Sequence, residues 1–238
     1  MTTGNLLEEG LAKIGIGETT GRAATLLTRY IEEIELFNPA YGLVKVRDRR
    51  ELIVKHILDS LAPLPILRGL HSSPHVADVG SGAGLPGIPL AVCMSGTEFT
   101  LVERMGRRAG FLRNILAILG LGNVVVAEAE MEKITPPSCF DIAVFRAFRP
   151  LEPVIFKGLA RLLRPGGTLA AYKGRLDSLK EEMSALLGRL DKEALASIAG
   201  WKAIALDPPF AEEQRHLLLI TCGQSAKPCS AQNRLSIQ

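Results

Sequence analysis

A glycine-rich loop between two apolar runs is the feature that most limits how this chain can fold. The segment His75–Val92 reads HVADVGSGAGLPGIPLAV, in which a predicted strand carries Asp78 and glycines alternate at positions 80, 82 and 84. Glycine is needed where the backbone takes a positive φ or comes close to a ligand, because any Cβ would collide there. The segment therefore predicts a strand, a ligand-binding turn and then a helix.

Two other classes of glycine loop fit this spacing poorly. A dinucleotide-binding loop, GxGxxG, would place its third glycine one residue later, where this chain has Leu85. The phosphate-binding pattern GxxxxGK[ST] does not match the loop, so it gives no support to nucleotide hydrolysis. Alternating glycines after an acidic residue resemble motif I of the class I methyltransferases, although a purely structural turn is the alternative interpretation.

Short apolar runs separated by helical segments follow from Val76 onward. The predicted strands are Val76–Val79, Phe99–Glu103, Asn123–Glu128, Phe140–Phe145, Thr168–Gly174, Trp201–Leu206 and Arg215–Ile220. The last two can pair antiparallel around DPPFAEE, and the others alternate with helices as in a parallel sheet. We therefore predict an α/β chain with the class I S-adenosylmethionine-dependent methyltransferase (Rossmann-like) fold, containing a seven-stranded, mostly parallel sheet.

Three predicted parts make up the chain. Residues 1–70 form an N-terminal helical cap, in which apolar residues recur at helical spacing over Leu6–Ile14, Leu27–Phe37 and Leu52–Leu61. Residues 71–222 form the methyltransferase domain. Residues 223–238 are polar and patternless, which predicts a flexible C-terminal tail.

The composition fits a cytoplasmic globular protein. Of 238 residues, 47% are hydrophobic and 22% charged, and the net charge of +3 permits a nucleic-acid partner without requiring one. No apolar stretch approaches the roughly 18 residues of a membrane span. The four cysteines lack a CxxC pair, which argues against a zinc site or a disulfide scaffold. We expect no membrane partner and no metal.

Acidic residues after the second and third strands suit a nucleoside cofactor. Glu103 ends the second predicted strand, where a carboxylate can accept hydrogen bonds from both ribose hydroxyls. The segment Glu128–Glu132 should pass beside an adenine, although an acidic run is also typical of a solvated face.

Several separate motifs resemble the small-subunit rRNA guanine-N7 methyltransferases, also called glucose-inhibited division protein B. Besides the glycine loop, they are KHILDSL (Lys55–Leu61), GRRAGFLRN (Gly106–Asn114), FRAF (Phe145–Phe148), YKG (Tyr172–Gly174) and RHLLLI (Arg215–Ile220). The resemblance covers the chain from about residue 20 to 221. The chain departs from the family pattern in the segment YGLV, where Gly42 and Val44 replace an asparagine and a threonine.

The resemblance implies S-adenosyl-L-methionine as the cofactor. It also implies 16S rRNA, the small ribosomal subunit or an assembly intermediate as the partner of a monomeric enzyme. The cofactor contacts that it implies are Gly80, Leu85, Met131, Glu132 and Arg146. Gly82 from the loop and Glu103 from the ribose argument join them.

Basic residues that flank the predicted cofactor face are candidates for RNA contact. They form two runs, Lys45, Arg47, Arg49, Arg50 and Lys55, and then Arg104, Arg107, Arg108 and Arg113. We select Arg107 and Arg108 as RNA-binding candidates, the alternative being a solvated charged surface. On the resemblance, Lys173 and Arg215 are further candidates, and His216 ranks below them.

The fourth predicted strand indicates which atom is methylated. Enzymes acting on an exocyclic amine need [DNS]PP[FYW] at the end of that strand, but here Asp207–Phe210 spells it between the last two strands. The fourth strand instead runs into Arg146, which offers donors and no acceptor. Cys139, a candidate nucleophile for cytosine C5 transfer, precedes the strand. Guanine N7 has a lone pair and no proton, so it needs no general base and we predict no catalytic acid or base.

Together with the fourth strand, the resemblance implies S-adenosylmethionine-dependent methylation of guanine N7 in 16S rRNA, in the loop near the decoding centre that this family modifies. Because side chains cannot readily reach N7 inside an A-form helix, the guanine must be unpaired or extruded. Two alternatives stay open. One is a methyltransferase for another RNA, a small molecule or a protein, and the other is a non-enzymatic RNA-binding or cofactor-sensing module.

Overall fold

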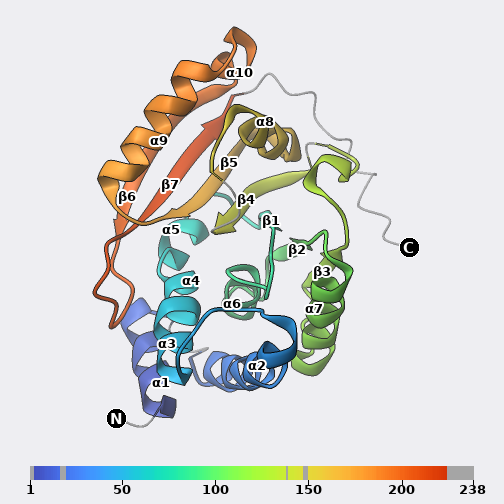
Figure 1. The fold of residues 1–238 in the computed structure, drawn as a ribbon, viewed down its shortest axis with the longest axis vertical. Coiled ribbons are helices and arrows are strands. Elements are labelled where there is room, and N and C mark those ends of the chain that lie inside the picture. The colour runs from blue at the N-terminus through green and yellow to red at the C-terminus, as the bar shows by residue number, and fades with distance from the viewer. Residues whose placement is uncertain (1–2, 17–19, 138, 147–149, 224–238) are drawn as a thin grey trace.

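A central sheet organises this computed structural model, which describes residues 3–16, 20–137, 139–146 and 150–223 (Figure 1). The strands are β1 (His75–Val79), β2 (Glu98–Val102), β3 (Val124–Ala127), β4 (Phe140–Arg146), β5 (Leu163–Lys173), β6 (Ile198–Leu206) and β7 (Arg215–Cys222). Their order is β3-β2-β1-β4-β5-β7-β6, and only the two pairings that involve β7 are antiparallel. The predicted seven-stranded, mostly parallel sheet is confirmed.

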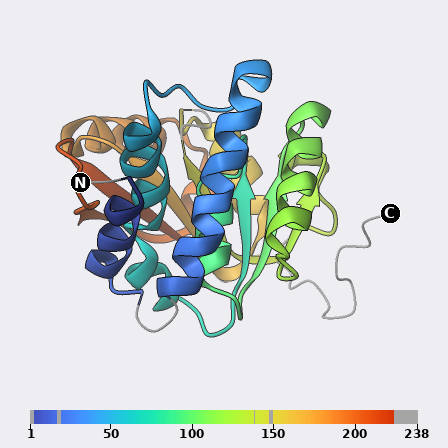
Figure 2. The same ribbon diagram turned by 90° about the horizontal axis from the view of Figure 1, so that it is seen from below.

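Helices cover both faces of the sheet (Figures 1 and 2). One face carries α1 (Thr3–Ile14), α2 (Thr20–Tyr41), α3 (Arg49–Leu52), η2 (Ile53–Leu58), α4 (Asp59–Leu61), α5 (Leu64–Arg68), α6 (Gly87–Cys93) and α7 (Gly106–Leu119). The other face carries η3 (Met131–Lys133), α8 (Pro153–Leu162), α9 (Leu176–Arg189) and α10 (Lys192–Ala196). Within the first group, α2 contacts α1, α6 and α7, and in Figure 2 it crosses in front of the sheet.

Apolar side chains alternate between the two faces of the sheet along each strand, and they form two separate hydrophobic cores. In β1, Val76 packs into the core under α1–α7, whereas Ala77 packs into the core under α8 and α9. Strand β4 repeats this pattern, with Val144 in the first core and Phe145 in the second. Side chains of a strand point alternately to opposite faces, so strands covered on both faces are mostly apolar, as the sequence shows.

The N-terminal helices share the first core with the sheet. Leu11, Leu27 and Ile57 are fully buried in the same cluster as Val76. The third predicted helix is one continuous helical run from α3 through η2 to α4, with a π-helical segment in its middle. Helix α5 was not predicted, because its few apolar residues are too short a run to show helical periodicity.

Several strand boundaries differ from the predictions, and three of them, in β2, β6 and β5, are described here. Strand β2 ends at Val102, so Glu103 is the first residue after it, and β6 begins at Ile198 rather than Trp201. Strand β5 begins at Leu163, so the segment LRPGG, which precedes the predicted start at Thr168, belongs to the strand. The register of β4 with β5 shifts between Phe140 and Ile142, so the extra residues bulge within the strand instead of ending it.

Two further predictions concern the ends of the chain and its apolar segments. Of the predicted tail, Gly223 alone falls within the described residues. Among those residues, every helix is too short or too polar to cross a membrane.

Candidate cofactor and substrate site

The glycine loop joins β1 to α6 in a conformation that requires its glycines. The φ angles of Gly80, Gly82 and Gly84 are 73°, 59° and 95°, in the left-handed region that side chains disfavour. A Cβ on Gly84 would also lie 2.4 Å from Cδ1 of Ile88. The positive φ angles thus explain why the sequence has glycine at each of these three positions.

Glu103 supports this loop from the neighbouring strand end. Its carboxylate is buried and accepts hydrogen bonds from the amides of Gly82 (2.9 Å) and Met105 (2.8 Å). The loop is also fixed from the cap, because the buried hydroxyl of Tyr30 donates to the carbonyl of Ala83 (2.7 Å). Glu103 is therefore held at the edge of the sheet where the ribose argument requires it.

Asp78 lies under the loop with one oxygen in use and one free. Oδ2 accepts from the amide of Gly87 (2.9 Å), whereas Oδ1 has no hydrogen-bond partner among the described residues. Burial raises the pKa of this carboxyl to about 7. Oδ1 is thus a buried acceptor that the described residues leave unpaired beneath the glycine loop, although Asp78 lines neither of the cavities described below. In the sequence, Asp78 served only to mark the predicted strand.

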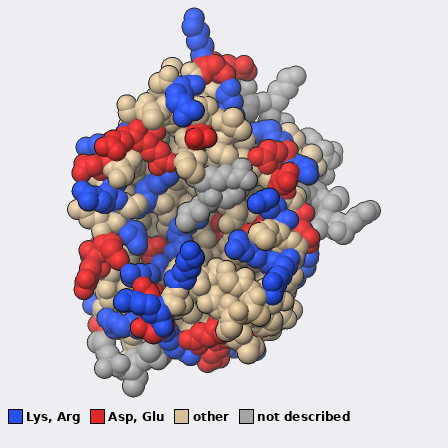
Figure 3. Space-filling model, in the orientation of Figure 1, with Lys and Arg blue, Asp and Glu red and all other residues tan. Residues whose placement is uncertain are grey.

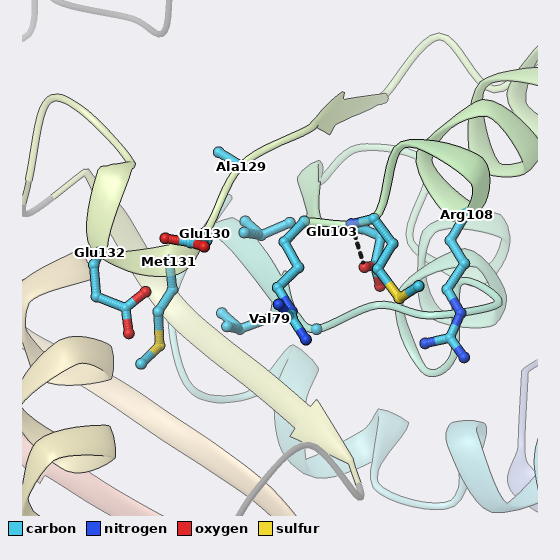
Figure 4. Close-up of a pocket in the computed structure, with 11 residues that line it drawn as sticks. Val79, Glu103, Arg108, Ala129, Glu130, Met131 and Glu132 are labelled. Atoms are coloured by element: carbon cyan, nitrogen blue, oxygen red, sulfur yellow. Dashed lines mark hydrogen bonds between the residues drawn. The ribbon is translucent and has the colours of Figure 1, made fainter.

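A first cavity of about 420 Å³ brings together four of the predicted cofactor contacts. It is lined by Val79, Gly80, Val102, Glu103, Arg104, Met105, Arg108, Ala129, Glu130, Met131 and Glu132. In Figure 4, Met131 and Glu132 lie on one side of this cavity and Glu103 and Arg108 on the other. Apolar side chains beside several carboxylates fit an adenosine, whose hydroxyl and amino groups are donors.

A second cavity of about 560 Å³ contains the other predicted cofactor contacts and the RNA candidates Arg108, Lys173 and Arg215, but neither Arg107 nor His216. Its lining includes Gly82, Leu85 and Arg146, which were predicted for the cofactor, and Lys173 and Arg215, which were predicted for RNA. Gly80 and Arg108 line both cavities, so the two spaces meet at the glycine loop. The predicted cofactor and RNA residues therefore converge on one continuous site.

The two cavities differ in charge. The described residues that line the second include one carboxylate, Asp59, and six cationic side chains, Lys45, Lys55, Arg108, Arg146, Lys173 and Arg215. The first is lined by three glutamates and two arginines. In Figure 3, lysine and arginine side chains border the hollow near the middle of the face shown. The second cavity thus suits an anionic ligand such as a nucleotide.

Two residues of the cap that the sequence analysis did not select stand in the second cavity. Asp59 accepts from Arg146 (3.0 Å) and from Arg215 (2.9 Å), and Nδ1 of His56 lies 3.0 Å from Nη2 of Arg146. Burial and, next, the charge of Arg146 lower the pKa of His56 to about 4, so Nδ1 of the neutral ring is the acceptor. Both residues belong to the motif KHILDSL, and this motif was the sequence signal from which they could have been selected.

The YGLV segment, where the chain departs from its family pattern, is held by a neighbouring helix. The side chain of Asn38 accepts from the amide of Val44 (2.9 Å) and donates to its carbonyl (3.0 Å). Gly42 has a φ of 58°. A polar side chain from α2 therefore ties down this wall of the second cavity.

Several of the RNA candidates have structural partners. Lys173 pairs with Glu182 (2.7 Å), and Nδ1–H of His216 donates to the carbonyl of Gly174 (2.6 Å), which ties the ends of β5 and β7 together. Arg107 lines neither cavity, because its guanidinium donates to the carbonyl of Ala40 and lies 4.3 Å from the ring centre of Tyr41.

These positions separate the expected effects of two adjacent arginines. Arg108→Ala should make the fall of RNA affinity with salt shallower by about one unit on a log–log plot, because one phosphate contact is lost. Arg107→Ala should leave that slope nearly unchanged and lower the free energy of unfolding by about 1 kcal/mol. Binding titrations over a salt series, with urea unfolding of the same variants, measure both. A shallower slope for Arg107→Ala alone would reverse the assignment.

The DPPF motif lies away from both cavities. Asp207 is exposed in the connection between β6 and β7, and the ring of Phe210 packs on the cap with the amine of Lys13 4.3 Å from its centre. Cys139 is buried immediately before β4 and also lines neither cavity.

We expect Asp207→Ala to transfer methyl groups at close to the wild-type rate, because Asp207 reaches neither cavity. The measurement is turnover on rRNA, with the melting temperature as a check on folding. A loss of more than about tenfold, or 1.4 kcal/mol, at unchanged stability would mean that this motif clamps an amine substrate after all.

Comparisons with known proteins agree with this architecture. A crystal structure of an S-adenosylmethionine-dependent O-methyltransferase from Thermotoga maritima superposes with a TM-score of 0.52 at 16% identity, covering 86% of this chain and 73% of that chain. A tRNA (m1A58) methyltransferase from Aquifex aeolicus gives a TM-score of 0.51 at 14% identity, covering 69% of this chain and 68% of that chain. At these identities the likeness shows the shared class I fold.

Sequence relatives are much more specific. Proteins named ribosomal RNA small subunit methyltransferase G are 36% identical in Treponema denticola, covering 92% of this chain and 95% of the relative, and 39% identical in Alkalilimnicola ehrlichii, covering 90% of each. A sequence profile described as GidB, rRNA small subunit methyltransferase G, matches residues 23–197. With the glycine loop and the two cavities in place, the chain belongs to the rRNA small subunit methyltransferase G family.

Proposed function

We propose that this protein transfers a methyl group from S-adenosylmethionine to N7 of a guanine in 16S rRNA, in a loop near the decoding centre. The observation that carries the proposal is the junction of two cavities at Gly80, one suited to a nucleoside and one cationic. Membership of the family supports rRNA of the small subunit as the substrate. We expect the enzyme to act in the cytoplasm, as a monomer.

The first cavity would hold the adenosine half of the cofactor. Glu103 would accept from the ribose hydroxyls, while the segment that contains Met131 and Glu132 would flank the adenine. Gly80 leaves room for the cofactor to pass into the second cavity, where Gly82, Leu85 and Arg146 would contact its methionine half. When bound, S-adenosylmethionine supplies an electrophilic methyl group on a sulfonium.

The second cavity would hold the target nucleotide. Lys173, Arg215 and Arg108 would neutralise its phosphates and orient the base. The only carboxylate among the described residues of this cavity, Asp59, already accepts from two arginines, so it is poorly placed to take a proton. This agrees with an acceptor atom that carries no proton, for which alignment alone can supply much of the rate, with effective molarities of roughly 10⁵ to 10⁸ M.

Chemical mapping of the product tests the proposal. Purified protein, labelled cofactor and 16S rRNA from a strain lacking the enzyme should give label in the RNA. Methylation at N7 puts a positive charge on the ring and makes the glycosidic bond labile, so borohydride and aniline should then cut the RNA at one nucleotide. Label in the RNA without such cleavage would overturn the N7 assignment. Label that enters only protein or small molecules would overturn the RNA assignment.

The form of the substrate can be determined with the same assay. Naked 16S rRNA, an assembly intermediate and the mature small subunit are compared at equal RNA concentration. Because the target guanine must be unpaired or extruded to reach the second cavity, we expect the fastest transfer to the form in which its loop is accessible.

A further inference from the structure

Asp59 links the cap to two strand ends across the second cavity. Its side chain, 6% exposed, accepts at Oδ2 from Nη1 of Arg146 (3.0 Å) and at Oδ1 from Nε of Arg215 (2.9 Å). Arg146 ends β4 and Arg215 begins β7. One carboxylate from a helix therefore joins two cations that come from different strands of the sheet.

Arg146 is held by a single stretch of the cap. Besides Asp59, its guanidinium contacts the carbonyl of Lys55 (3.1 Å) and Nδ1 of His56 (3.0 Å). Lys55 and His56 belong to the π-helical segment η2, and Asp59 follows it directly. Such segments occur frequently at functional sites, and here the π-helical backbone precedes the carboxylate that meets both guanidinium groups.

The charges in the second cavity explain why a carboxylate is needed at this place. Arg146 and Arg215 contact the same carboxylate, so without it two like charges would face each other in a partly buried space. A neighbouring hydrogen bond, from the hydroxyl of Tyr172 to the carbonyl of Ser60 (2.7 Å), fixes the position of this helix against β5. The two guanidinium groups are thereby kept in one arrangement on the cavity wall.

We propose that Asp59 is a positioning residue that holds Arg146 and Arg215 as a fixed pair of donors, Arg146 for the methionine half of the cofactor and Arg215 for the acceptor nucleotide. The proposal rests on the proposed function, because that function assigns both ligands to the second cavity. Both oxygens of Asp59 are engaged, so it acts through the two arginines and not as a base. Loss of the carboxylate should leave the arginines free to turn away, and misplacement of an orienting group by about 1 Å can cost on the order of 100-fold in rate.

Steady-state kinetics of Asp59→Asn and Asp59→Ala test this role. At saturating S-adenosylmethionine and 16S rRNA, kcat should fall by about 10- to 100-fold in both variants. Wild-type kcat in Asp59→Asn at saturation of both substrates, with only the KM values changed, would overturn the proposal. Sodium formate should restore part of kcat to Asp59→Ala, since it fits between the two arginines. An equal response to sodium chloride would also count against the proposal.

Glu51→Gln is the matched control. Glu51 lies on the same helical run and pairs with Arg47 (3.2 Å) and Lys55 (3.1 Å), so its loss removes a carboxylate and two ion pairs from the cap. We expect its kcat to stay near the wild-type value. A fall in kcat equal to that of Asp59→Asn would show that any weakening of this helix lowers the rate, which would overturn a specific role for Asp59.

A measurement without turnover separates this proposal from the proposed function. In protein labelled with ¹⁵N-arginine, the Nε–H of Arg215 should be protected from exchange in the wild type and exposed in Asp59→Asn, with Arg215→Lys used to assign the signal. If wild-type protein fails to methylate 16S rRNA, the proposed function fails. The signal still shows in that case whether Asp59 holds Arg215. An unprotected Nε–H in the wild type would overturn the proposal about Asp59.

Discussion

Replacing Gly80 by valine should abolish cofactor binding while the sheet stays folded. Gly80 lines both cavities and has a φ of 73°, so a branched side chain would occupy the junction and would strain the loop. We expect the affinity for S-adenosylmethionine to fall at least about 100-fold, or roughly 2.7 kcal/mol. Isothermal titration measures the affinity, and circular dichroism reports the fold.

Gly120→Val separates this effect from backbone strain. Gly120 has a similar φ, 62°, at the C-terminal cap of α7, and a Cβ there would meet nothing within 4 Å. The control variant should lose stability but bind the cofactor normally. If Gly80→Val binds S-adenosylmethionine with near-wild-type affinity and has a native circular dichroism spectrum, the glycine loop does not bind the cofactor.

Asp78→Asn should stabilise the protein increasingly as the pH rises. Because burial raises the pKa of Asp78 from 3.8 to about 7, the folded protein retains a proton that the unfolded chain releases between these values. The stability associated with this proton is fully present below the unfolded pKa and is lost as the pH rises through the folded pKa. Asp78→Asn has no carboxyl at this position, so its free energy of unfolding does not fall in this way. Relative to the wild type, its free energy of unfolding should rise by roughly 2 to 3 kcal/mol between about pH 5 and pH 8.

Urea unfolding of both proteins without cofactor, over this pH series, is the measurement. His56 acts in the opposite direction, since burial lowers its pKa from 6.5 to about 4 and stability therefore falls as the pH falls. This contribution is common to both proteins, so the difference between them isolates Asp78. A difference that stays constant across the series would mean that Asp78 does not titrate in this range.

The fold could be predicted because its signals are local. Apolar runs bounded by turns gave the seven strands, and the spacing of the loop from Glu103 placed that residue at the correct sheet edge. The start of β5 was predicted wrongly, because the segment LRPGG is typical of a turn, whereas here it continues the strand through a bulge. Pairing with a neighbouring strand decided that boundary, and pairing cannot be read from a local segment.

The site could be predicted only in part, for a similar reason. Asp59 meets partners 87 and 156 positions away, so its ion pairs follow from the packing of the cap on the strand ends. Arg107 and Arg108 were equivalent in sequence, but adjacent residues of a helix point about 100° apart, and only the structure shows which one faces the cavities. The positive φ angles of Gly80 and Gly82, in contrast, could be predicted from the sequence, because they depend on the local backbone alone.

The core shared by the cap and the sheet limits how this enzyme could be divided or recombined. Val76, Ile142 and Leu217 are covered by N-terminal helices, so a fragment that began at the first strand would expose a wide apolar face to water. A foreign cap with different helix spacing would have to match that face as well as supply Asp59. The N-terminal helices therefore cover the sheet as well as carry Asp59, so they cannot be exchanged as an independent module unless the new helices match that apolar face.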